Sequence, residues 1–67
     1  MSDPATVLKL YRGMDDQWLA DMKAAFTEDR EANRARDNAA GVKFCDGRLR
    51  LIAREQARRK AAAGKKR

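Results

Sequence analysis

The chain has 67 residues, a formal net charge of +6, one cysteine and no histidine. This length allows one small domain, and its few large apolar side chains barely offset the entropy of ordering the chain, so we expect self-association or a partner surface. One cysteine excludes an intrachain disulfide, and the lack of histidine excludes an ordinary zinc site. Apolar stretches are short, so no signal peptide or membrane-spanning segment is expected.

The positive charge is concentrated at the C-terminal end. Residues 1–53 hold nine basic and nine acidic residues, whereas residues 54–67 hold seven basic residues and one acidic residue. Such clustering favours contact with nucleic acid, with an acidic protein face or with an anionic membrane surface.

Residues 4–12 are predicted to form a short helix. Asp3 is a candidate N-cap, and Pro4 suits the first helical position because its missing N–H costs nothing there. Gly13 is expected to end the helix in the left-handed conformation. So short a helix requires packing against the rest of the chain.

A second helix is predicted over residues 16–37. Asp15 is its candidate N-cap, and Met14 and Leu19 occupy the positions of a hydrophobic staple. Apolar residues then recur at helical spacing as far as Phe26, after which the helix is dense in both charges and carries alanines on the same stripe.

A third helix is predicted over residues 42–61, folding back antiparallel on the second after a turn at residues 38–41. Its apolar face holds the following residues: Val42, Cys45, Leu49, Ile52 and Gln56, widened by Phe44 and Leu51. An alternative places two strands around Asp46-Gly47, a favoured two-residue hairpin turn. The helical interpretation is preferred because an isolated hairpin is marginally stable. The fold class is thus all-α, and residues 62–67 form a basic tail.

No catalytic, metal or cofactor site is predicted. Without histidine, Cys45 is the remaining nucleophile, and its apolar neighbours indicate packing rather than reactivity. The paired acids Asp15-Asp16 and Glu28-Asp29 are explained by helix capping and by an exposed, charge-alternating helix face. We therefore expect no enzyme activity and no small-molecule substrate.

Two sets of residues are candidates for partner contacts. Apolar residues predicted for a protein interface are Trp18, Met22, Phe26, Leu49 and Ile52, with Trp18 as the anchor because tryptophan is enriched in interface hot spots. Basic residues predicted to contact nucleic acid or an acidic partner are Arg54, Arg58, Arg59, Lys60, Lys65, Lys66 and Arg67. The aromatic residues lie at helical spacing, which favours packing over nucleobase stacking.

The stretch Tyr-Arg-Gly-Met-Asp-Asp-Gln-Trp-Leu, followed by a charged helix and Phe-Cys-Asp-Gly-Arg-Leu-Arg-Leu-Ile, resembles small structural proteins of bacteriophages and prophages. The layout is similar to that of the gpW-like head-to-tail joining proteins, which are small, basic and built on two antiparallel helices. That family places a strand hairpin between its helices. The resemblance implies a virion assembly or head-tail connector role, present in several copies.

Three functions follow as hypotheses. The first is a structural or connector protein, in a homo-oligomer or larger assembly, whose tail contacts an acidic neighbour or DNA. The second is a nucleic-acid-binding accessory or regulatory protein. The third is a small inhibitor of a host enzyme. The expected location is the cytoplasm, or the virion if the chain is phage-encoded.

Overall fold

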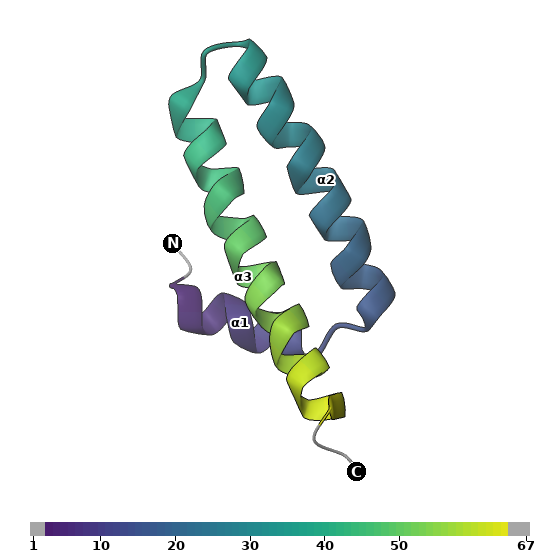
Figure 1. Cartoon of the computed structure of the whole chain (residues 1–67). Coiled ribbons are helices and arrows are strands. Elements are labelled where there is room, and N and C mark those ends of the chain that lie inside the picture. Colours follow the sequence, from purple (N-terminus) through teal and green to yellow (C-terminus); the bar gives the residue numbers. More distant parts are fainter. Residues whose placement is uncertain (1–2, 65–67) are drawn as a thin grey trace.

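The computed structural model describes residues 3–64, and this part of the chain consists of three helices without a strand. They are α1 (Pro4–Arg12), α2 (Asp16–Ala35) and α3 (Ala39–Gly64), drawn in Figure 1. The predicted all-α fold class is confirmed. The alternative strand hairpin at Asp46-Gly47 is wrong, because α3 runs through both residues.

Helix α1 begins as its sequence predicts and ends differently. The Asp3 carboxylate accepts a hydrogen bond of 2.8 Å from the Thr6 N–H, and the same bond lowers the pKa of Asp3. Gly13 was expected to be left-handed, but its φ is −84°. The helix instead ends in tight turns, in which the Gly13 and Met14 N–H groups donate to the carbonyls of Leu10 and Tyr11.

Helix α2 begins at the predicted cap and ends two residues before the predicted boundary. The Asp15 carboxylate accepts a 2.8 Å hydrogen bond from the Trp18 N–H, which satisfies a backbone donor that has no partner inside the helix. The helix ends at Ala35 rather than at residue 37. Asp37 has a φ of 58°, so the chain reverses there.

The turn between α2 and α3 lies earlier than residues 38–41, where the sequence placed it. Asn38 accepts a 3.1 Å hydrogen bond from the Gly41 N–H through its side-chain oxygen, as an N-cap residue does, so Ala39 already starts α3. The left-handed residue is therefore Asp37, not Asn38 or Gly41. A short polar side chain such as that of aspartate tolerates this conformation.

Helix α3 is longer than the predicted range of 42–61. It continues to Gly64, so residues 62–64 of the predicted tail are helical. Gly47 lies within the helix at a cost of about 1 kcal/mol relative to alanine. Burial of Cys45 and Ile52, seven residues apart on one helical face, offsets this cost.

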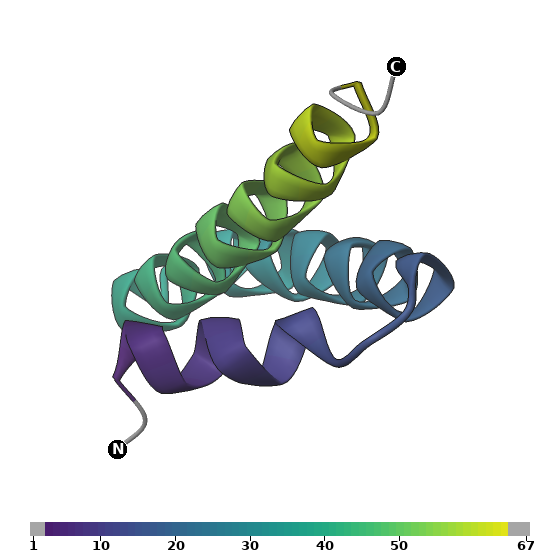
Figure 2. The ribbon, with the colours of Figure 1, turned by 90° about the horizontal axis from the view of Figure 1, so that it is seen from below.

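The helices meet in a small core. Helices α2 and α3 lie side by side, and α1 crosses α3 on one side of that pair (Figures 1 and 2). The buried cluster comprises Val7 and Tyr11 of α1, Leu19 of α2 and Ile52 of α3. Four half-buried residues pack against it: Met14, Met22, Phe26 and Leu51. The short first helix is thus stabilised by tertiary contacts, as its length requires.

Nearer the turn, polar contacts connect α2 and α3. The Arg30 Nε lies 2.5 Å from an Asp46 carboxylate oxygen in an ion pair that lacks the geometry of a hydrogen bond. A Cβ atom at Gly41 would lie 2.5 Å from the side chain of Asn33, so only glycine allows this approach without movement. Asn33 in turn accepts a hydrogen bond of 3.0 Å from the side chain of Asn38.

Candidate interaction surfaces

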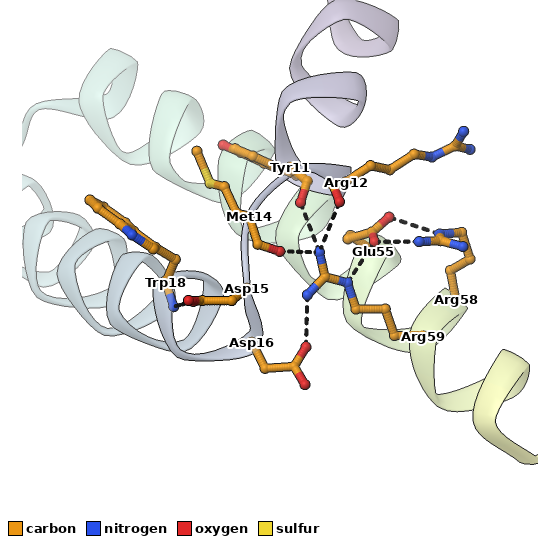
Figure 3. Close-up of polar contacts among 9 residues, drawn as sticks. All are labelled: Tyr11, Arg12, Met14, Asp15, Asp16, Trp18, Glu55, Arg58 and Arg59. Atoms are coloured by element: carbon orange, nitrogen blue, oxygen red, sulfur yellow. Dashed lines mark hydrogen bonds and ion pairs between the residues drawn. The ribbon is translucent and has the colours of Figure 1, made fainter.

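The C-terminal half of α3 is tied to the end of α1 by a single guanidinium group. Arg59 donates hydrogen bonds of 2.7 Å to Asp16 and 2.9 Å to the Tyr11 carbonyl, and it also donates to the Met14 carbonyl. A longer contact of 3.4 Å reaches the Arg12 carbonyl. Figure 3 shows these acceptors converging on Arg59 from α1, from the connection after it and from α2. Arg59 therefore adds a side-chain donor to carbonyls at and just after the end of α1, of which that of Tyr11 also accepts the Met14 N–H.

Glu55 is the buried anion of the same cluster. Its side chain is 1 % exposed, and it accepts two hydrogen bonds from Arg58, of 3.0 and 2.7 Å, and one of 2.7 Å from Arg59. The Arg58 hydrogen bonds, assisted by Arg59 and opposed by burial, lower the pKa of Glu55 from 4.5 to about 2. Glu55 in turn raises the pKa of both arginines. The carboxylate is ionised at neutral pH, and its burial is compensated by two cations.

These contacts divide the predicted basic contact residues into different groups. Arg59 is 22 % exposed and Arg58 is 49 % exposed at the side chain, and both hold Glu55. Arg54 and Lys60 are exposed and take part in none of the ion pairs of residues 3–64. The remaining predicted contacts, Lys65, Lys66 and Arg67, lie outside the described residues.

The predicted protein-interface residues also occupy different environments. Ile52 is completely buried in the core, whereas Met22, Phe26 and Leu49 are half-buried. Trp18 is 60 % exposed. Ile52 is thus occupied by contacts within the chain, and Trp18 presents the largest apolar surface of the set.

Trp18 is exposed because of its position in the first turn of α2. Successive helical residues are rotated by about 100°, so Leu19 points into the core and Trp18 points to its side. The backbone N–H of Trp18 is held by the Asp15 cap, which fixes the start of the helix. Figure 3 shows the indole directed away from the Arg59 cluster. Trp18 and the C-terminal cations are therefore separate surfaces.

Other groups with reactive chemistry have structural surroundings. Cys45 is a free thiol that is 3 % exposed, which agrees with the predicted packing role. No group of three or more potential ligands that could hold a metal ion occurs among residues 3–64. Within the same range, no helix has the length and apolarity that crossing a membrane requires.

Sequence reasoning missed the roles of Glu55 and Arg59. Both were present in the sequence as an i, i+4 pair of opposite charge, a spacing that predicts contact along a helix. The spacing of Glu55 and Arg59 alone does not indicate that Glu55 is buried, because its burial depends on where α1 ends.

Comparisons of the chain with protein-family models, with curated proteins and with solved structures found no match. Its function is therefore argued from its surfaces.

Proposed function

We propose that this chain is a non-enzymatic interaction protein that functions in a multi-subunit assembly. Its helices bind a protein partner, or further copies of the chain, through apolar side chains that its own core leaves uncovered. The basic end of α3 contacts an acidic partner surface or nucleic acid.

The exposure of Trp18 carries the protein-binding half of the proposal. Tryptophan is large and apolar, and it is strongly enriched among residues that dominate binding energy. Five apolar residues are buried among residues 3–64. Trp18, which is 60 % exposed, contributes little to this core and leaves a large apolar surface in water. Covering that surface with a partner is favourable by about 25 cal/mol per Å².

The basic half of the proposal rests on Arg54 and Lys60, which are exposed outside the ion pairs described above. Arg58, being half-exposed, can add a contact while it holds Glu55. The internal pairing of Arg59 reduces the charge available to a partner. This favours a supporting electrostatic contact over a nucleic-acid site as the main function.

A role in phage head-to-tail assembly is a narrower form of the same proposal, supported by resemblance in layout. The strand hairpin that gpW-like proteins place between their helices does not occur within residues 3–64. The broader proposal of an assembly component is independent of that resemblance, because it depends on Trp18 and on the charge distribution.

Light scattering after size exclusion, at low and at high salt with the ratio of absorbance at 260 and 280 nm, tests the proposal. We expect a defined oligomer that persists in high salt and carries no nucleic acid. A monomer that releases co-purified nucleic acid as salt rises would instead support the nucleic-acid-binding alternative. A monomer that forms a one-to-one complex with one host protein would support the inhibitor alternative.

Two variants test whether assembly depends on Trp18 or on the basic end of α3. Trp18→Ser should weaken assembly while leaving the helical signal in circular dichroism unchanged, because the side chain is mostly exposed. The double variant Arg54→Glu, Lys60→Glu should leave assembly unchanged and weaken a salt-sensitive contact made by the C-terminal end of α3. Assembly that survives Trp18→Ser would refute the role given to Trp18.

A further inference from the structure

A groove between α1 and the first half of α3 is not part of the surfaces described so far. Figure 2 shows the start of α1 beside this part of α3. Its apolar lining consists of Pro4 and Val7 of α1 and of Phe44 and Leu51 of α3. Phe44 is 56 % exposed, so more than half of the surface of this large apolar side chain is in contact with water.

Gly47, which has no side chain, lines the groove together with Phe44 and Leu51. Phe44, Gly47 and Leu51 lie on one face of α3, at the spacing of three and four residues that aligns helical positions. A Cβ atom at Gly47 would meet no other atom within 4 Å. The helix thus has an unfilled position at the centre of an apolar strip.

The edges of the groove carry one sign of charge. Lys43, Arg48 and Arg50 line it, and no acidic side chain lines it among residues 3–64. Asp46, which lies between Lys43 and Arg48 in the sequence, forms its ion pair with Arg30 of α2. None of the three rim cations takes part in an ion pair of residues 3–64.

We propose that this groove binds an acidic amphipathic segment of a partner protein. Apolar side chains of the segment lie over Gly47 against Phe44 and Leu51, and its carboxylates pair with the cations of the rim. This combination corresponds to helix-in-groove recognition with electrostatic complementarity. The inference rests on the proposed function as an interaction protein and identifies the chemistry of one partner.

The lining favours a peptide over single-stranded nucleic acid. Val7 and Leu51 are aliphatic and provide no platform for base stacking. Phe44, the aromatic residue of the groove, already has the Arg48 guanidinium 5.0 Å above its ring and the Phe26 ring at 6.2 Å in an edge-to-face contact. One face of the ring is therefore already occupied by the guanidinium.

The test uses a fluorescently labelled synthetic helix with leucines at i, i+3, i+4 and i+7 and glutamates on its other face. Two peptides serve as controls: a scrambled sequence, and one in which lysine replaces every glutamate. Fluorescence anisotropy measures binding to the full-length protein, and amide NMR locates it. We expect the acidic amphipathic peptide to bind and to shift the amide signals of residues 43–51.

Gly47→Phe should weaken this binding at least about tenfold, a difference of about 1.4 kcal/mol. Its matched control, Gly47→Ala, should bind almost as well as the unchanged protein. Both substitutions replace glycine in a helix with a residue of higher helix propensity, so neither should unfold α3. Arg48→Glu should also weaken binding, whereas Trp18→Ser should leave it unchanged.

Four outcomes would overturn the groove proposal. They are absence of peptide binding, binding that survives Gly47→Phe, amide shifts confined to the C-terminal residues, and tighter binding of a single-stranded oligonucleotide that Gly47→Phe abolishes. If the groove proposal fails while assembly still depends on Trp18, the proposed function stands. Loss of the Trp18 dependence with groove binding intact would overturn the proposed anchor instead.

Discussion

Replacing Arg59 with methionine tests whether the C-terminal arginines of this chain stabilise the fold. Methionine keeps much of the length of the side chain and removes every hydrogen bond of the guanidinium. The buried Glu55 then retains Arg58 as its sole cationic partner, and the carbonyls at the end of α1 lose their side-chain donor.

The magnitude follows from the individual contacts. The hydrogen bond to the buried carboxylate contributes about 1.5–3 kcal/mol, and those to the α1 carbonyls about 0.5–1.5 kcal/mol together. The pair with Asp16, whose side chain is 90 % exposed, contributes less than about 1 kcal/mol. We therefore expect Arg59→Met to lower the free energy of unfolding by about 2–5 kcal/mol.

This loss is large for so small a protein. At about 0.05–0.15 kcal/mol per residue, a chain of this length has a total stability of about 3–10 kcal/mol. Urea unfolding followed by circular dichroism at 222 nm measures the difference, and the melting temperature should fall by about 4–8 °C for each kcal/mol lost.

Arg54→Met is the matched control, because Arg54 is exposed on the same helix and belongs to none of the ion pairs of residues 3–64. It should change stability by less than about 0.5 kcal/mol. The stability of Arg59→Lys should lie between those of Arg59→Met and Arg54→Met, because an ammonium group cannot reproduce the planar guanidinium that reaches several acceptors. Equal stabilities of Arg59→Met and Arg54→Met would refute the structural role of Arg59.

Three further predictions concern acid stability, glycine positions and capping. Because the pKa of Glu55 is lowered, its contribution to the free energy of unfolding is complete above pH 4.5 and is lost as the pH falls through about 2. Glu55→Gln removes this titration, so the variant should lose less stability across that pH range. Acid titration followed by circular dichroism measures the difference. A steeper loss would contradict the assignment. Gly47→Ala should stabilise the protein by about 0.5–1 kcal/mol, because alanine has the higher helix propensity. Gly41→Ala should lack this gain, because its Cβ would displace the Asn33 side chain. Equal melting temperatures of the two variants would argue against the close approach at Gly41. Asp15→Ala should lower stability by about 0.5–2 kcal/mol in urea unfolding, and Asp15→Asn should retain most of it because asparagine caps equally well.

Some features of this fold are encoded locally. The Asp3 and Asp15 caps each use a side chain and a backbone N–H three residues away, so the sequence alone predicts them. The apolar spacing of α3 likewise predicted a helix, and the burial of Cys45 and Ile52 on one face follows from that period. The all-α fold class needed nothing more than these local signals.

The positions of the helix ends were predicted less accurately than the helices themselves. The reversal at Asp37 was expected at residues 38–41, because asparagine and glycine tolerate left-handed backbone more readily than aspartate. Asn38 instead caps α3 with its side chain, because the Gly41 N–H lies within hydrogen-bond distance of its side-chain oxygen. Gly13 likewise stays right-handed, while Arg59 supplies donors to the end of α1.

The surfaces were decided by tertiary structure. Whether Arg59 reaches a partner or the end of α1 depends on contacts across more than forty residues, such as the one to Tyr11 at a separation of 48. Phe44 was predicted to widen the apolar face of the third helix, yet more than half of its surface is exposed and it lines a groove together with Val7 of α1. The sequence by itself determined three helices, the N-terminal caps of the first two and an excess of positive charge at one end. Only the packing of α1 across α3 decided which cations are used inside the fold and which apolar side chains remain for a partner, because burial depends on neighbours that are distant along the chain.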